Sequence, residues 1–135
     1  MEETLISFET AKLAKEKEFD EKVYREYDKS GYLRCTSKSS DVVLGPYEEL
    51  LKSTEYAAPT QSLLQKWLRD EHNIHISVFC DYNIKDETFN TYWNINVINL
   101  SWGEDKEQYI EVAIRNYNKT YEEALEIGLQ AALRL

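Results

Sequence analysis

Glycine, proline and cysteine are scarce in this sequence of 135 residues, which contains four glycines, two prolines and two cysteines. The glycines are too widely spaced for a phosphate-binding loop, and no GxSxG or CxxC pattern occurs. Cys35 and Cys80 therefore predict neither a zinc site nor a disulfide scaffold. Their small number favours a reduced, cytoplasmic protein, and no cofactor is expected.

Long apolar runs and positive charge are also lacking. Nowhere do 18 apolar residues follow one another, and the opening residues, Met1-Glu2-Glu3, lack the basic start of a signal peptide. We therefore expect no membrane association. Lys and Arg number 16 against 25 Asp and Glu, which gives a net charge of -9. Because Lys and Arg supply the affinity for phosphate backbones, direct binding to nucleic acid is not expected either.

The clearest structural pattern is a helix followed by a strand between Ala58 and Tyr82. Thr60 follows Pro59 and can cap a helix, and after Ile74 the apolar period changes from 3.6 to 2. A half-buried strand is therefore expected directly after the helix. The apolar stripe of the helix is Leu63, Leu64, Trp67 and Leu68. The apolar face of the strand is Ile74, Ile76, Val78, Cys80 and Tyr82.

The flanking segments predict further helices and strands. Ser7 can cap a helix over 8–18, and two β-prone runs, 23–27 and 32–36, flank the turn-like Asp28-Lys29-Ser30-Gly31 and predict a hairpin. Residues 83–90 are polar and predict a turn. Two more strands are expected over 91–100 and 108–115, with Trp93 in the core.

A capping box of Thr120 and Glu123 predicts the start of the last helix. Gly128 lies on the apolar face of that helix and indicates close backbone packing, because glycine costs about 1 kcal/mol there relative to alanine. Together these elements predict an α+β fold: an antiparallel sheet, made of a three-stranded meander plus an N-terminal hairpin, with helices packed on one face. We expect a single domain over residues 1–135.

Several of these segments together resemble a family of small phage and prophage proteins from Bacteroides-type gut bacteria. The resemblance spans most of the chain, but the matching residues are caps, apolar stripe positions and a helix glycine. It implies a phage or prophage setting in the cytoplasm of a bacterial host and carries over no catalytic residue. The matching segments are Phe8 to Lys12, Ala58 to Thr60, Trp67 to Arg69, His72 to Ile76, Tyr121 to Leu125, Gly128 and Ala132-Leu133.

Polar residues on the outer face of the predicted sheet form one candidate site. If the first two meander strands pair in the expected register, this face contains a histidine base and several hydrogen-bonding groups, although a solvated sheet face has the same composition. His72 and His75 form an HxxH pattern, but zinc needs three or four converging ligands, so no metal site is expected. The residues of this face are His75, Ser77, Asp81, Tyr92, Asn94 and Asn96.

A second candidate is an acidic surface with the aromatic residues Tyr92, Trp102 and Tyr109, which are of the kind that contribute much of the energy of protein interfaces. The order helix, three strands, helix from Thr60 onward is also that of double-stranded RNA-binding domains. Glu122 and Glu123 stand where those domains present basic residues, which argues against RNA. The acidic residues near the aromatic ones are Glu104, Asp105, Glu107 and Glu111.

These observations favour a non-catalytic module that binds a host or phage protein, as a monomer or a homodimer. The binding residues predicted for it are Tyr92, Trp102, Tyr109, His75, Asn94 and Asn96. Two alternatives stay open. The first is an acidic mimic of nucleic acid, or a regulator, motivated by the net charge of -9. The second is a small enzyme that uses the outer sheet face.

Overall fold

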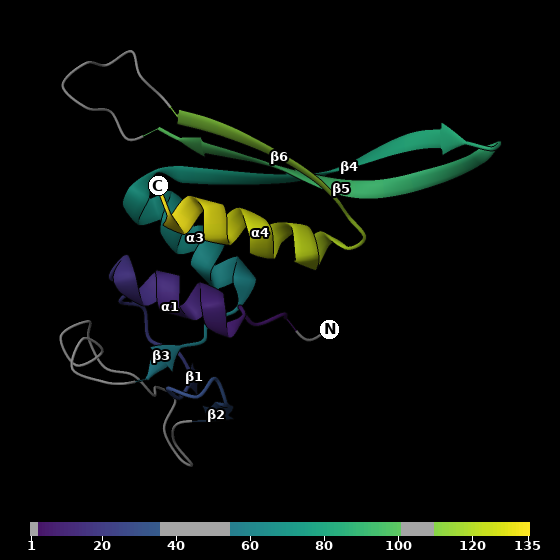
Figure 1. Cartoon of the computed structure of the whole chain (residues 1–135). Helices are drawn as coiled ribbons and strands as arrows, with labels where there is room; N and C mark the ends of the chain where they lie inside the picture. The colour runs from purple at the N-terminus through teal and green to yellow at the C-terminus, as the bar shows by residue number, and fades with distance from the viewer. Residues whose placement is uncertain (1–2, 36–54, 101–109) are drawn as a thin grey trace. The chain divides into compact units, whose positions relative to one another are not determined.

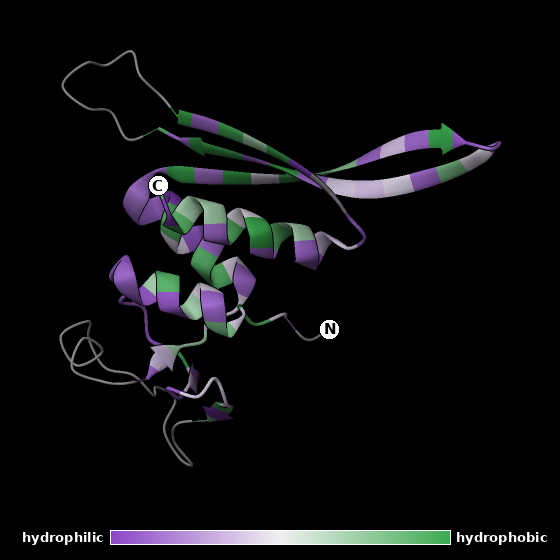
Figure 2. Cartoon of the chain, viewed as in Figure 1, coloured by the Kyte–Doolittle hydropathy of each residue, from purple (hydrophilic) through white to green (hydrophobic). Residues whose placement is uncertain are grey.

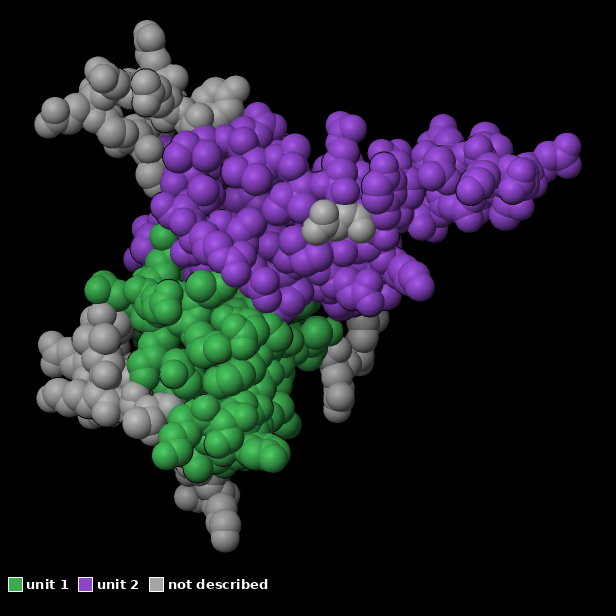
Figure 3. Space-filling view, in the orientation of Figure 1, with its two compact units in different colours: residues 1–67 green, residues 68–135 purple. Residues whose placement is uncertain are grey.

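The computed structural model describes residues 3–35, 55–100 and 110–135 (Figure 1). Contacts divide the chain into two compact units, residues 1–67 (unit 1) and 68–135 (unit 2) (Figure 3). Helices and antiparallel sheets are both present, so the predicted α+β class is confirmed. None of the described helices is both long and apolar enough to cross a lipid bilayer. The single domain over residues 1–135 stays a prediction.

The first helix of unit 1, α1, spans Phe8–Glu16 and ends two residues earlier than predicted. The Ser7 side chain caps it, because its oxygen accepts a hydrogen bond of 3.2 Å from the Thr10 amide. The helix ends before Glu18, whose φ of 69° is left-handed and cannot continue a right-handed helix. Its buried residues are Thr10, Ala11 and Ala14.

A small antiparallel sheet of unit 1 contains the predicted hairpin. Its strands are β1 (Arg25–Tyr27), β2 (Leu33–Cys35) and β3 (Tyr56–Ala57), in the order β2-β1-β3. The Asp28 carboxylate accepts hydrogen bonds from two amides of the turn between β1 and β2. Gly31 adopts the left-handed φ of 87° that this turn requires. The prediction of a hairpin is therefore confirmed.

The core of unit 1 contains Trp67, which is only 4% exposed. Its ring meets that of Phe19 edge-on, with centroids 5.2 Å apart. Its Nε1 donates a hydrogen bond of 2.9 Å to a carboxylate oxygen of Asp20. The buried indole thus keeps its polar atom satisfied, and the prediction that Trp67 belongs to the core is confirmed.

The predicted helix with a short link to a strand is also present. Helix α3 spans Gln61–His72, and the boundary between the two units falls inside it. The Leu63 amide donates to the Thr60 hydroxyl oxygen at 3.2 Å, as expected for a capping threonine. Strand β4 begins at Ile74, and the single linking residue, Asn73, has a left-handed φ of 54°. Asparagine tolerates this conformation better than most residues.

Unit 2 contains the predicted three-stranded meander. Its strands are β4 (Ile74–Lys85), β5 (Thr88–Asn99) and β6 (Ile110–Asn118), all antiparallel, in the order β4-β5-β6. Val97 lies between Ile76 of β4 and Val112 of β6. Apolar and polar residues alternate along these strands, as Figure 2 shows. One face of the sheet is therefore apolar where the three strands pair.

Helix α4, residues Tyr121–Leu133, packs on the apolar face of this sheet. Thr120 caps it by accepting a hydrogen bond of 3.1 Å from the Glu123 amide. The Glu123 carboxylate in return accepts one of 3.2 Å from the Lys119 amide, one residue before the position expected for a capping box. Gly128 is buried against the sheet, so the predicted close packing at this glycine is confirmed.

Three sequence-based expectations for unit 2 were wrong. Residues 83–90 do not form a polar turn: strands β4 and β5 continue through them, and only Asp86 and Glu87 make the turn, with φ values of 53° and 63°. Two left-handed residues match the twist of a two-residue hairpin, so the strands stay paired up to the turn. Cys80 is exposed and Trp93 is half-buried, because their part of the sheet extends beyond the core.

Candidate functional site

The β4–β5 hairpin extends beyond the third strand. Strand β6 pairs with β5 only from Trp93 to Asn99, so the residues of β5 between Thr88 and Tyr92 pair with β4 alone. We call this two-stranded part, residues 81–92, the distal arm. Figures 1 and 3 show it projecting from the rest of unit 2. A two-stranded ribbon by itself is only marginally stable in water, so this length requires an explanation.

One face of the distal arm is apolar and exposed. Tyr82, Ile84 and Phe89 are 62%, 63% and 69% exposed. Ile84 lies directly opposite Phe89 in the ladder, and the Tyr82 and Phe89 ring centroids are 5.9 Å apart. The three side chains thus form one patch, which we call the arm patch.

The arm patch continues the apolar face that forms the core of unit 2. Side chains of one parity along β4 lie on the same side of a sheet, so Ile84 and Tyr82 share the face of the buried Ile76. Helix α4 covers this face only as far as its first residue, where the ring of Tyr121 meets that of Trp93 at 5.6 Å. The same face is therefore buried at the base of the hairpin and exposed along the arm.

The opposite face of the hairpin contains a tyrosine next to a carboxylate. Tyr92 lies directly across from Asp81, and the centroid of its ring is 4.8 Å from that of Tyr117. Desolvation, followed by the negative charge of Asp81 and a hydrogen bond to it, raises the pKa of Tyr92. Its hydroxyl therefore stays protonated at neutral pH and acts as a hydrogen-bond donor, not as a base.

The other predicted binding residues lie apart from the arm patch. His75 is half-buried, with Nε2 3.0 Å from the side-chain oxygen of Asn73. Asn96 is also half-buried and donates a hydrogen bond of 2.8 Å to Glu111. Asn94 is only 2% exposed, which leaves almost no side-chain surface for a partner, and its Oδ1 has no hydrogen-bond partner in the described structure. Trp102 and Tyr109 lie outside the described residues.

The polar residues proposed for catalysis do not converge. His75, Ser77 and Asp81 lie on the same face of β4, but His75 and Asp81 are six residues apart, about 20 Å along a strand. A nucleophile and its base need to be within hydrogen-bonding distance of each other. Within the described ranges, no three His, Cys, Asp or Glu side chains are grouped so that they could hold a metal ion.

Sequence reasoning missed most of the arm patch, although a signal was present. It placed Tyr82 at the end of an apolar strand face but assigned Ile84 and Phe89 to a turn. Every second residue from Ile74 to Ile84 is apolar, and this period of two marks the residues as strand.

Comparison of the chain with protein-family models, with curated proteins and with solved structures finds no match in any of the three.

Proposed function

We propose that this chain is a non-catalytic module, of phage or prophage type, that binds a host or phage protein through the arm patch. The observation that supports this proposal is the exposure of Tyr82, Ile84 and Phe89 together on one face of a projecting hairpin. Large apolar side chains gathered on a surface mark sites of protein association. Aromatic residues also supply a large part of the binding energy at such sites.

The charge of the chain defines the kind of partner. The arm ends in Asp86 and Glu87, and the whole chain has a net charge of -9. A partner with an apolar groove bordered by basic residues would complement both the arm patch and this charge. A nucleic acid would not, since its phosphates would be repelled.

The backbone of the hairpin adds a reason for a partner. A natural sheet protects long edges with proline, lysine or a covering segment, yet β4 has only one lysine, Lys85, and no proline. Burial of the arm patch by a partner would stabilise an element that is marginal by itself. The wide spacing of His75 and Asp81 gives the enzyme alternative less support than protein binding.

The test compares two pairs of residues that face each other across the arm. In Ile84→Thr/Phe89→Thr the apolar pair becomes polar but keeps a good strand-forming residue. In the control, Asn83→Thr/Asn90→Thr, the neighbouring pair changes on the opposite face. Partners are captured from a lysate of the bacterium that carries the gene, purified, and titrated against wild type and both variants.

Binding through the arm patch predicts that the first variant weakens affinity at least about tenfold, as loss of interface anchors does. The control should stay within about twofold, as near-neutral contacts do. Equal affinities for wild type and the Ile84→Thr/Phe89→Thr variant would contradict the proposal. So would a lysate from which no specific partner is recovered.

A further inference from the structure

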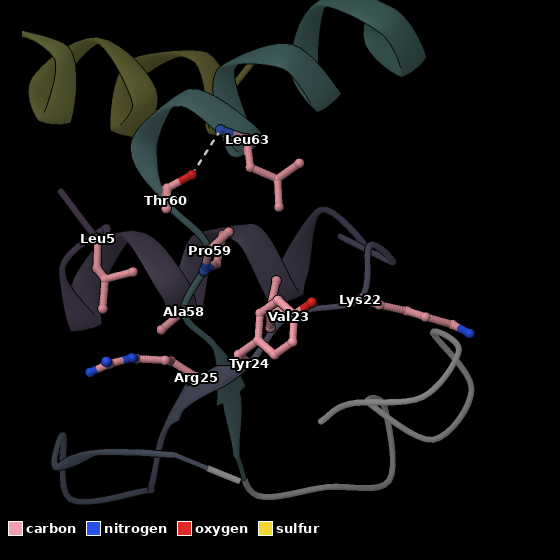
Figure 4. Close-up of a pocket in the computed structure, with 9 residues that line it drawn as sticks. All are labelled: Leu5, Lys22, Val23, Tyr24, Arg25, Ala58, Pro59, Thr60 and Leu63. Carbon is pink, nitrogen blue, oxygen red and sulfur yellow. Dashed lines mark hydrogen bonds between the residues drawn. The ribbon is translucent and has the colours of Figure 1, made fainter. Parts of the chain in front are cut away.

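Unit 1 contains an apolar pocket of about 270 Å³. Its apolar walls come from three separate segments of the chain, as Figure 4 shows: the N-terminal segment, the residues before β1, and the residues that lead into α3. The volume is slightly below the range found for small-molecule sites, roughly 300–1,000 Å³, so only a small ligand would fit. The apolar lining residues are Leu5, Val23, Ala58, Pro59 and Leu63.

Backbone hydrogen bonds hold these walls in place. The Ile6 amide donates to the Pro59 carbonyl at 3.1 Å, and the Gln61 amide donates to the Thr4 carbonyl at 2.8 Å. The Ala58 amide donates to the Arg25 carbonyl at 2.9 Å. Each bond joins two of the lining segments or their direct neighbours. The pocket is therefore formed before any ligand arrives, which lowers the cost of binding.

The charged residues of the pocket are both cations. Lys22 and Arg25 line it, and no Asp or Glu does. Figure 4 shows their side chains extending in opposite directions, each with its charged end pointing away from the apolar walls, so the positive charges lie at the outer border of the pocket. Both residues are exposed, and neither forms an ion pair within the described part of the chain. The charge at the border of this apolar pocket is therefore positive, although the chain as a whole is acidic.

Two hydroxyl groups line the pocket, those of Tyr24 and Thr60, and the Thr60 hydroxyl already forms a hydrogen bond. Thr60 lines the pocket, but its side-chain oxygen accepts the hydrogen bond that caps α3. Besides the exposed Tyr24, the recognition chemistry on offer is therefore an apolar surface with positive charge at its borders. Such a site matches a molecule with an apolar body and an anionic end.

We propose that this pocket binds a small molecule with an apolar body and a carboxylate group. The apolar walls enclose the body, and Lys22 or Arg25 pairs with the carboxylate. An arginine can do so through two parallel hydrogen bonds, and a lysine as a point charge. This site is separate from the arm patch, so its existence does not depend on the protein-binding function.

Octanoate is a suitable probe, because it has an apolar chain and a carboxylate. Octylammonium, with a similar chain and a positive charge, is the control for the charge. Acetate, which has the carboxylate without the long chain, is the control for the apolar body. Each is titrated into the full chain while amide chemical shifts are followed by NMR. Octanoate should produce saturable shifts at residues 22–25 and 58–63. Acetate, which lacks the apolar body, should produce none that saturate, and octylammonium should bind more weakly by up to about fivefold, the upper effect of an exposed ion pair.

The charge-removing variant is Lys22→Gln/Arg25→Gln, in which both substituted side chains are exposed and the fold should persist. Its matched control is Lys29→Gln/Lys119→Gln, which changes net charge equally at exposed positions outside the pocket lining. The first variant should weaken octanoate binding by about two- to fivefold, and the control by less than twofold.

Three results would overturn the proposal. The first is an absence of saturable octanoate shifts at the pocket residues. The second is equal binding of octanoate and octylammonium, which would show that the cations have no part in recognition. The third is equal weakening by Lys22→Gln/Arg25→Gln and by Lys29→Gln/Lys119→Gln, which would reduce the effect to net charge.

Discussion

Gly128 of α4 lies so close to Ile95 of β5 that a Cβ atom added to the glycine would be 2.8 Å from the Ile95 Cγ2. The Cγ2 of Ile76 would be 2.9 Å away. Real Cβ atoms essentially never approach other atoms so closely, so a side chain here would push the helix from the sheet. The glycine thus sets the distance at which α4 covers the meander.

Replacing Gly128 by alanine should therefore destabilise the protein. Alanine favours helix by about 1 kcal/mol over glycine, but overpacking a core costs ~1–3 kcal/mol. We expect a net loss of about 1 kcal/mol in the free energy of unfolding, measured with urea. In an Ile76→Leu/Ile95→Leu background the β-branches are gone, so Gly128→Ala should cost less. The same cost in both backgrounds would show that these methyl groups are not the obstacle.

The capping threonine of α4 provides a second stability prediction. Thr120→Ala removes the oxygen that accepts the Glu123 amide and should cost about 1 kcal/mol of unfolding free energy. Thr120→Ser keeps a hydroxyl at the same place and should cost less than about 0.5 kcal/mol. The two variants are compared by urea denaturation. A loss for serine as large as that for alanine would locate the effect in the threonine methyl group.

Tyr92 gives a prediction about pH. Its pKa is raised above the ordinary value of 10.0 by desolvation and then by Asp81, so the folded state holds the phenolic proton more tightly than the unfolded state. The stability that this supplies is fully present below pH 10 and is lost as the pH rises through the folded-state pKa. Tyr92→Phe removes the titrating group. As the pH is raised from 9 to values above 10, the free energy of unfolding should therefore fall less in this variant than in wild type.

The contribution of Asp81 can be separated by a conservative change. Asp81→Asn keeps the size of the side chain but removes the negative charge, so the pKa of Tyr92 should fall toward its ordinary value. It is read from the NMR signal of the labelled tyrosine ring carbon as the pH is raised. A pKa of Tyr92 that does not change in this variant would leave desolvation and the neighbouring Tyr117 as the causes of the rise.

The sequence predicted those elements whose signals are local. Ser7, Thr60 and Thr120 each cap a helix as expected, and the alternation in β4 and β5 places Val97 and Ile95 in the core. Caps and periodicity depend on residues within one turn or a few strand positions, so they can be read from the chain directly. Gly128 on the apolar face of the last helix also correctly predicted close packing of the helix backbone there.

The position of exposed residues could not be predicted in the same way. Cys80 lies on the predicted face of β4 but is exposed. Its burial depends on where α4 stops covering the sheet, and that position is set by contacts between segments far apart in the sequence. Asn94 was expected on an open polar face and is buried. Between Trp93 and Ile95 the register of β5 with β6 shifts, and such an irregularity has no clear sequence pattern. The pocket of unit 1 also needs three segments to meet.

The distal arm gives the last prediction, because its amides should be less protected from hydrogen exchange than those at the base of the hairpin. Asn90 and Asn96 are both on β5 and occupy equivalent places in the ladder with β4, opposite Asn83 and Ser77. Asn96 also lies in the part of β5 that pairs with β6, across from Ala113, whereas Asn90 has β4 alone. Local opening of a two-stranded ribbon costs less than opening a covered sheet.

The amide of Asn90 should therefore exchange at least about tenfold faster than that of Asn96 under native conditions, a difference within the normal range of local stabilities. Mass spectrometry or NMR after transfer to D₂O measures both rates in one sample. Equal protection at the two positions would mean that the arm is as stable as the sheet at its base. A partner would then not be needed to stabilise the arm, since the ribbon would persist by itself.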